Sequence, residues 1–349
     1  MGISQAAIDD LARRGAEQGV DLSPGLRLIE ARLRELVAAD LPLVEATSRY
    51  LIDAGGKRFR PMLVLLTGLL GDADPTDRDL VDAGAIVELV HLSTLYHDDV
   101  IDTAEVRRGS PAAHVKWSNT TAILTGDFLL ARASELSAEL GVEVTRIMSR
   151  TIADLAAGQI REVQGSAEAT AHGMAPVSAD RDHYLTVISE KTASLIASSC
   201  RLGALLSGQH TAAIETLTTY GWRLGMAFQL ADDVLDLASE ETASGKVPGT
   251  DLREGVRTMP VLLALEAEGP DSELAALLDA TAGPDAEEAI AKALPLLRDH
   301  PAMELARDAA RLEAAKAKRA LRPLEDDPSS GPVLDGLRYL ADYAVERFE

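Results

Sequence analysis

The segment LYHDDVIDTAEVRRG, residues 95–109, places three carboxylates where the surrounding apolar sequence predicts a buried helix. Asp98 and Asp102 are four residues apart, so in a helix they project from one face, about 40° apart, and Asp99 flanks them. Like charges on one face destabilise a helix unless a cation lies between them. Hard carboxylate oxygens suit Mg²⁺, which usually also binds the phosphate oxygens of a substrate.

A second segment, FQLADDVLD, repeats the pattern with Asp232, Asp233 and Asp236. Either copy alone could be a solvated acidic face rather than a metal site. Two other Asp pairs, at 9–10 and 326–327, lack an Asp four residues after the first and lie in polar surroundings. The two complete patterns instead lie in apolar sequence, where an unpaired charge costs several kcal/mol. We expect the two acidic helices to face each other across a cavity and to bind metal ions against a phosphate-bearing ligand.

The composition favours helices throughout. Of the 349 residues, 46% are hydrophobic and only 3% are aromatic, and β-branched runs are short. Length alone would suggest two domains, but uniform helix-forming preferences predict one all-α bundle of ten or more helices, without strands, in residues 23–349. Residues 1–22 are expected to form a loosely packed helix. The expected helices are 5–19, 23–53 (with Ser23 as N-cap), 61–71, 80–101, 119–140, 142–166, 180–207, 211–238, 257–268, 271–281, 285–298, 300–321 and 331–347, with loops at 169–179 and 239–256.

Charge and cysteine content exclude several classes of protein. The net charge of −22 argues against a nucleic-acid partner, because an acidic surface repels phosphate backbones. The single cysteine, Cys200, cannot form an internal disulfide and lies in an apolar run typical of a helix core. No run approaches 18 apolar residues, and the N-terminus lacks the layout of a signal peptide. We expect a cytoplasmic protein without a transmembrane segment.

Two basic segments predict anion binding. GGKRFRP places Lys57, Arg58 and Arg60 at the start of a helix, where backbone N–H groups and the helix dipole also favour anions. An ordinary basic loop is the alternative. Arg107 and Arg108 follow the first acidic motif, and guanidinium groups bind phosphate oxygens in a bidentate manner.

Two further side chains share a face with the acidic motifs. His91 lies two helical turns before Asp98, and Gln229 lies three residues before Asp232. In another setting, His91 would more often be a core histidine with satisfied hydrogen bonds. Its alignment with Asp98 makes it a candidate anion contact, whereas His97 points elsewhere and is expected to be structural.

A lone lysine and a polar loop complete the set of candidates. Lys191, followed by Thr192, lies in an apolar helix and should therefore have an anionic partner. The loop at 239–256 contains Lys246 and Asp251 and follows the second acidic helix directly. That position suits a lid which brings a cation over bound phosphate.

Taken together, these motifs resemble those of the all-trans isoprenyl diphosphate (polyprenyl) synthases. They occur in the family's order and span about two-thirds of the chain. The matching segments are GGKRFRP (55–61), HDDVIDTAEVRRG (97–109), LTGDFLLARA (124–133), AAGQI (156–160), SEKTASL (189–195), GMAFQLADDVLD (225–236) and GKVPGTDLREG (245–255).

The resemblance implies an isoprenoid synthase fold with two diphosphate sites. About three Mg²⁺ ions would bind between the acidic motifs and the allylic diphosphate. Their ligands would be Asp98, Asp102, Asp232 and Asp236. The allylic diphosphate would also contact Arg107, Lys191, Thr192, Gln229 and Lys246, while isopentenyl diphosphate would contact Lys57, Arg60, His91 and Arg108. The catalytic set would be Asp98, Asp99, Asp102, Asp232, Asp233 and Lys191.

The implied reaction is a head-to-tail condensation that needs no side-chain nucleophile. The allylic diphosphate ionises, the cation alkylates isopentenyl diphosphate, and a proton is lost to the departing diphosphate. An apolar cavity would keep water from the cation. The resemblance also implies a homodimer whose product passes to membrane enzymes. The chain departs from the family at Thr250, where Asn is usual, and at Val256, where Lys is usual; Arg257 follows directly.

The residues before the first acidic motif predict a medium or long product. In this family they line the tunnel that holds the growing chain, and here they are Thr94, Ser93, Val90 and Ile86, none of them aromatic. Tyr96 projects about 200° away from Asp98. The expected product is therefore longer than farnesyl and geranylgeranyl diphosphate.

Three alternatives remain open: a short-chain synthase, a class I terpene cyclase, and a non-catalytic subunit that binds prenyl diphosphates. A cyclase would usually carry an Asn/Ser/Glu metal motif in place of the second aspartate-rich motif and would not need GGKRFRP. A non-catalytic subunit would be expected to lose acidic residues, and this chain keeps all six.

Overall fold

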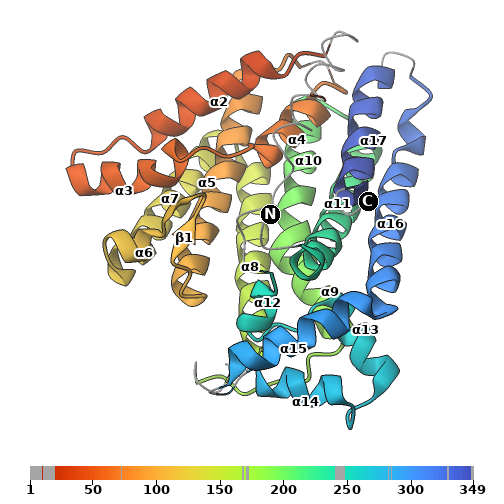
Figure 1. Cartoon of the computed structure of the whole chain (residues 1–349). Helices are drawn as coiled ribbons and strands as arrows, with labels where there is room; N and C mark the ends of the chain where they lie inside the picture. The colour runs from red at the N-terminus through yellow and green to blue at the C-terminus, as the bar shows by residue number, and fades with distance from the viewer. Residues whose placement is uncertain are drawn as a thin grey trace.

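A computed structural model describes residues 10, 20–71, 73–166, 169, 173–239, 248–281, 283, 285–327 and 330–346. The prediction of an all-helical fold is confirmed apart from one small hairpin (Figure 1). The predicted N-terminal helix at 5–19 lies almost wholly outside the described residues, and the domain division at residue 22 stays a prediction.

The N-terminal half contains α2 to α8 and the hairpin. The elements are α2 (Ser23–Leu36), α3 (Pro42–Asp53), α4 (Phe59–Gly68), α5 (Arg78–Ile101), β1 (Val106–Arg107), β2 (Ser110–Pro111), α6 (Ala113–Lys116), α7 (Asn119–Glu139) and α8 (Val142–Gly165).

The C-terminal half continues with further helices. They are α9 (Arg181–Ile188), the π-helical segment η1 (Ser189–Ala193), α10 (Ser194–Leu206), α11 (Thr211–Ala238), α12 (Thr250–Arg253), α13 (Met259–Glu268), α14 (Glu273–Ala280), α15 (Ala286–Asp299), α16 (Ala302–Ala320), the 3₁₀ segment η2 (Arg322–Leu324) and α17 (Gly331–Glu346).

The prediction of one helix over 23–53 was wrong. The chain breaks between α2 and α3, because Pro42 cannot donate a helical hydrogen bond and forces Leu41 into an extended conformation (φ −91°, ψ 109°). Ser23 is also not the N-cap of α2. That position is Leu22, and the N–H of Ser23 instead donates to Asp21 Oδ1 at 2.9 Å.

Three local predictions also need correction. The expected helix at 180–207 is interrupted by η1, and the loop at 239–256 contains the short helix α12. Strands were not expected, but β1 and β2 form an antiparallel hairpin in which Val106 pairs with Pro111 and Arg107 with Ser110. This hairpin turns the chain directly after the first acidic motif.

Two apolar cores flank the centre of the bundle. The larger core contains side chains of α2 to α5, α7, α8, α10, α11 and α17. The second contains side chains of α9, α11 and α13 to α16, so α11 contributes to both. Helix α10 packs against α4, α5, α8 and α11, while α13 to α15 cover one end of the bundle (Figure 1). Cys200 is fully buried, as expected of a core residue, and burial raises the pKa of its thiol. None of the described helices is both long enough and apolar enough to cross a membrane.

Candidate active site

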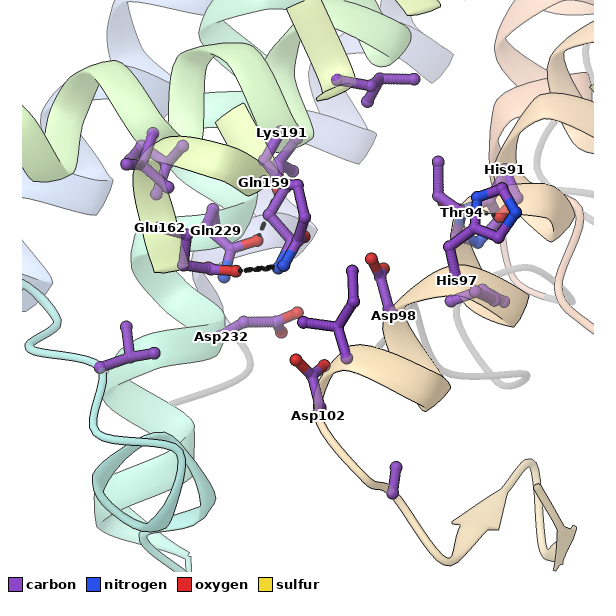
Figure 2. A pocket seen from close by; sticks show the side chains of 18 of the residues that line it. His91, Thr94, His97, Asp98, Asp102, Gln159, Glu162, Lys191, Gln229 and Asp232 are labelled. Atoms are coloured by element: carbon purple, nitrogen blue, oxygen red, sulfur yellow. Dashed lines mark hydrogen bonds and ion pairs between the residues drawn. The ribbon is translucent and has the colours of Figure 1, made fainter. Parts of the chain in front are cut away.

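The two acidic motifs line one cavity of about 1410 Å³. Asp232 extends from α11 toward Asp98 on α5 and Asp102 directly after it, so the motifs face each other as expected (Figure 2). Nearly all the described candidates from the sequence line this cavity. They are Lys57, Arg60, His91, Asp98, Asp102, Arg107, Arg108, Lys191, Thr192, Gln229, Asp232, Asp233 and Asp236. Lys246 lies outside the described residues.

Burial controls the charge of the α5 carboxylates. It raises the pKa of Asp98 to about 6, and the nearby Lys191 only partly offsets it. Burial likewise raises the pKa of Asp102 to about 6, and the charge of Asp98 acts in the same direction. Two desolvated carboxylates one helical turn apart therefore repel each other when both are ionised, and a bound cation would offset that repulsion.

Asp99 does not line the cavity, and its predicted catalytic role stays a prediction. It is fully buried, and its Oδ1 accepts a hydrogen bond of 2.6 Å from Nε of Arg107, whose Nη2 lies 2.6 Å from the same oxygen in an ion pair. Because it is about 100° from Asp98 around the helix, it points into the bundle and not into the cavity. Asp99 thus contacts Arg107, which does line the cavity.

The second motif also divides its carboxylates between different partners. Asp233 is buried and accepts hydrogen bonds from the Tyr184 hydroxyl and, at 2.8 Å, from Gln229 Nε2. Burial raises the pKa of Asp233 to about 7. Asp232 is the member that faces α5 (Figure 2).

Asp236 holds the start of α12. Its two carboxylate oxygens accept backbone N–H groups of Thr250 and Asp251, each at 3.2 Å. Its backbone oxygen accepts the N–H of Gly249 at 3.0 Å. Sequence reasoning missed this anchoring role, and the predicted metal-binding role of Asp236 stays a prediction.

A buried carboxylate, Glu88, balances the basic side of the cavity. Glu88 Oε1 lies 2.8 Å from Nη1 of Arg58 and 3.9 Å from Nη2 of Arg108, and the side chain is only 2% exposed. Arg58 is itself buried and also forms an ion pair with Glu30 on α2, so it connects α2 to Glu88 on α5. The prediction missed Glu88, although a single Glu in the apolar run AIVELV was the available signal.

The cationic groups near Glu88 are partly desolvated. Burial lowers the pKa of Arg60 to about 10, and the neighbouring Arg108 acts in the same direction. Burial, followed by the charges of Arg60 and Arg108, lowers the pKa of His91 well below its ordinary value. His91 is therefore neutral near pH 7 and offers an N–H donor and not a charge.

Backbone strain is concentrated at this basic side. Arg58 and Arg108 have positive φ values of 48° and 52°, which non-glycine residues rarely adopt. Arg108 Nη1 donates to the backbone oxygens of Leu51, at 2.8 Å, and of Gly55. Arg58 Nη2 likewise donates to the Ile52 backbone oxygen at 3.0 Å, so hydrogen bonds to this segment accompany the unusual conformation of both arginines.

Lys191 lies in the π-helical segment and pairs with Glu162 on α8, which confirms the expected anionic partner (Figure 2). Burial opposes the charge of the amine, but Glu162 and then Asp98 raise the pKa of Lys191 above its ordinary value. Gln159 Nε2 donates to the same Glu162 oxygen at 3.2 Å. Glu162 was not predicted.

Two glycines allow neighbouring helices to pack closely against η1. A Cβ on Gly158 of α8 would lie 2.6 Å from the backbone nitrogen of Lys191. A Cβ on Gly225 of α11 would lie 2.6 Å from Cα of Ala193. On the side of α11, Trp222 Nε1 donates to Ser189 Oγ at 2.9 Å. The widened turn that presents Lys191 is therefore fixed by tertiary packing, and such turns often occur at functional sites.

The segment after α12 contributes residues that depart from the family pattern. Val256 and Arg257 both line the cavity, and Arg257 Nη2 pairs with Asp279 of α14 at 2.7 Å. Glu254, which was not predicted, also lines the cavity, and burial and the charge of Asp102 raise its pKa to about 7. His97, expected to be structural, places Nε2 3.2 Å from the Ile123 backbone oxygen and so links α5 to α7.

The residues present fit a divalent metal ion held jointly with a ligand. Within the described ranges, no three His, Cys, Asp or Glu side chains converge tightly enough to hold a metal by themselves. The facing carboxylates Asp98, Asp102 and Asp232 supply hard oxygen donors on both sides of the cavity. Mg²⁺ commonly takes one or two carboxylates plus phosphate oxygens and water, which matches an open donor set of this kind.

Known proteins resemble the chain over nearly its whole length. A nonaprenyl diphosphate synthase of Mycobacterium tuberculosis is 43% identical over 340 residues, covering 94% of this chain and 97% of that protein. The structure of a decaprenyl diphosphate synthase from Rhodobacter capsulatus aligns with a TM-score of 0.84 at 32% identity, covering 98% of this chain and 99% of that one.

A third relative was solved with ligands. The structure of a polyprenyl synthase from Caulobacter crescentus, complexed with calcium and isoprenyl diphosphate, aligns with a TM-score of 0.84 at 34% identity and covers 98% of both chains. The profile of the polyprenyl synthetase family matches residues 41–297 of this chain. The chain therefore belongs to the polyprenyl synthetase family and is a prenyl-transferring enzyme.

Proposed function

We propose that this enzyme condenses isopentenyl diphosphate with an allylic diphosphate, in a Mg²⁺-dependent reaction, to give an all-trans polyprenyl diphosphate of medium or long chain. The observation that carries the proposal is the arrangement of charge in one cavity of about 1410 Å³. Carboxylates of the two acidic motifs face each other across the cavity, and an arginine cluster with its own buried counter-ion lines the same cavity. That arrangement suits two diphosphates, of which one is bound through metal ions.

Different side chains would bind the diphosphates of the two substrates. Asp98, Asp102 and Asp232 would hold Mg²⁺, which supplies Lewis-acid stabilisation of the departing diphosphate. Lys191 stays protonated beside Glu162 and offers a fixed positive charge to the same diphosphate. Arg107, held by Asp99, adds a further cation at the mouth of the cavity.

On the other side, the chain would bind isopentenyl diphosphate. Arg60 and Arg108 provide charge, and His91 provides a neutral N–H donor. The allylic carbon–oxygen bond breaks, the isopentenyl double bond forms the new carbon–carbon bond, and a proton leaves to the released diphosphate. Apolar lining residues such as Phe59 and Phe228, stacked 5.7 Å apart, keep water from the cation.

The cavity wall supports a long product. Val90, Ser93 and Thr94 line the cavity, and no aromatic side chain is among the three, whereas Ile86 is buried outside the lining. Tyr96 is turned away, as expected, and its hydroxyl donates to the Thr47 backbone oxygen at 2.5 Å. The wall beside the first acidic motif therefore leaves room for a growing chain.

A turnover assay tests the proposal. Purified enzyme with isopentenyl diphosphate and either dimethylallyl or farnesyl diphosphate should give butanol-extractable product only when Mg²⁺ is present, with chains longer than geranylgeranyl. Products no longer than geranylgeranyl from either primer would contradict the chain length. No turnover with any primer would instead favour a non-catalytic subunit, and cyclic hydrocarbon products would favour a terpene cyclase.

The proposal includes a cytoplasmic homodimer whose product passes to membrane enzymes. Large apolar side chains are exposed on α7 and on the two helices α3 and α6 that pack against it, namely Leu124, Leu43 and Val115. Such a patch is typical of a protein–protein interface. Analytical ultracentrifugation of the protein and of Leu124→Glu tests the dimer; a wild-type monomer would refute it.

A further inference from the structure

A chain of hydrogen bonds runs from α9 through α11 to the π-helical segment. The Tyr184 hydroxyl donates to Asp233 Oδ2. Gln229 Nε2 donates to Asp233 Oδ1 at 2.8 Å, and Gln229 Oε1 accepts from the Thr192 hydroxyl at 2.8 Å. Three of these four residues were sequence candidates, but Tyr184 was not.

The carboxylate fixes the direction of every bond in this chain. The Tyr184 hydroxyl and the amide nitrogen of Gln229 each donate to a different carboxylate oxygen of Asp233, which accepts with both. The amide oxygen of Gln229 then necessarily faces Thr192, whose hydroxyl must donate to it. The hydroxyl oxygen of Thr192 is left with its lone pairs for the cavity, which Thr192 lines.

Tyr184 determines whether this arrangement holds. Its side chain is only 5% exposed, and burial followed by the charge of Asp233 raises the pKa of the phenol well above its ordinary value. The phenol therefore remains a donor at any physiological pH. Without it, the buried Asp233 would lose one of its two side-chain donors, and its carboxylate would be free to rotate together with the Gln229 amide that is bonded to it.

We propose that Tyr184 is a positioning residue for the allylic diphosphate site, acting through Asp233 and Gln229 to set the hydrogen bond that Thr192 offers to the cavity. This inference rests on the proposed function, because it takes Thr192 to face a diphosphate and its coordinated water. Donors on the bound ligand, such as metal-bound water, would meet the Thr192 lone pairs directly. A rotated Gln229 would no longer accept the Thr192 hydrogen, so that hydrogen could turn toward those donors and the contact would be lost.

The test measures binding of a non-reactive thiolo analogue of farnesyl diphosphate in the presence of Mg²⁺, together with the KM for isopentenyl diphosphate. Tyr184→Phe removes only the hydroxyl, and we expect it to weaken analogue binding about tenfold, as for loss of a hydrogen bond to a charged group. The KM for isopentenyl diphosphate should change less than about twofold, because that substrate binds the arginine side of the cavity.

Tyr220→Phe is the matched control. Tyr220 is also fully buried, and its hydroxyl donates to the Leu337 backbone oxygen at 2.7 Å, but it does not line the cavity. It should lower stability in the same way without changing analogue binding. If Tyr184→Phe and Tyr220→Phe affect stability and both substrates equally, Tyr184 is merely structural and the proposal fails.

A double-mutant cycle tests the route of the effect. If Tyr184 acts through Thr192, then Tyr184→Phe should add less than about twofold in a Thr192→Val background. A tenfold loss that persists in that background would overturn the proposal. If the wild-type enzyme transfers no prenyl group and does not bind the analogue, the proposed function fails first, and with it this assignment; an active enzyme with an unaffected Tyr184→Phe variant refutes the assignment alone.

Discussion

Gly158→Ala should damage the active site far more than it damages the fold. The added Cβ would lie 2.6 Å from the Lys191 backbone nitrogen and 2.9 Å from Glu190 Cβ, and ordinary contacts begin at 3.4 Å. The π-helical segment would therefore have to move by 3.4 − 2.6, or about 0.8 Å. Crowding of this kind lowers the free energy of unfolding by about 1–3 kcal/mol. Replacing a helical glycine with alanine raises it by about 1 kcal/mol, because alanine favours the helix.

The functional cost should be larger than this net change in stability. A misplacement of about 1 Å can slow catalysis about 100-fold, which corresponds to about 2.7 kcal/mol of transition-state stabilisation. We expect kcat/KM for the allylic substrate to fall roughly 10- to 100-fold, because Lys191 and Thr192 move together. Steady-state kinetics on both substrates, with thermal unfolding measured in parallel, would separate the two costs.

Gly331→Ala provides the matched control for this experiment. Gly331 begins α17, and a Cβ there would meet nothing within 4 Å. Its activity and stability should stay close to wild type. The reasoning is refuted if Gly158→Ala keeps its kcat/KM within about twofold of wild type, or if its loss of activity merely follows unfolding.

Three further predictions follow from the site. Ser93→Phe should shorten the product, because Ser93 is fully buried and lines the cavity; chromatography of the products checks this, and an unchanged chain length would remove Ser93 from the tunnel. Glu88→Gln should lower the free energy of unfolding by about 3 kcal/mol, because Arg58 and Arg108 lose their shared buried counter-ion. Urea denaturation measures this free energy, and a decrease of less than about 1 kcal/mol would contradict the prediction. Folding lowers the pKa of His91, so below about pH 6.5 the unfolded chain binds a proton more readily and the free energy of unfolding falls as pH falls. The free energy of unfolding of His91→Gln, relative to that of wild type, should rise by up to about 1.4 kcal/mol per pH unit below that value. If the two proteins lose stability in parallel as pH falls, His91 is not held neutral in the folded chain.

Sequence periodicity was sufficient to predict the faces of the main helices. Asp98 and Asp102 fall on one face of α5, and the same reasoning applied to α11 brought Asp232 opposite them. The angular offset that places Asp99 away from the cavity was available from the same geometry. The break before α3 was also readable from Pro42, whose effect on its neighbours is local.

Features that depend on tertiary contacts could not be predicted in this way. The π-helical turn at Lys191 follows from close packing by Gly158 and Gly225, which are distant in sequence. Tyr184 bonds Asp233, which lies 49 residues later in the sequence, and no local sequence pattern predicts that bond. Arg58 resembled its basic neighbours, and nothing local in the sequence indicated its burial against Glu30 and Glu88.

The central claim is that carboxylates on both sides of the cavity bind one metal–diphosphate group. Its most direct test is calorimetric binding of the thiolo analogue of farnesyl diphosphate, with and without Mg²⁺, to the wild-type enzyme and to Asp98→Ala and Asp232→Ala. The account predicts tight Mg²⁺-dependent binding to the wild type, and loss of the Mg²⁺ dependence in both variants while each remains folded. Mg²⁺-dependent binding that survives in either variant would contradict it.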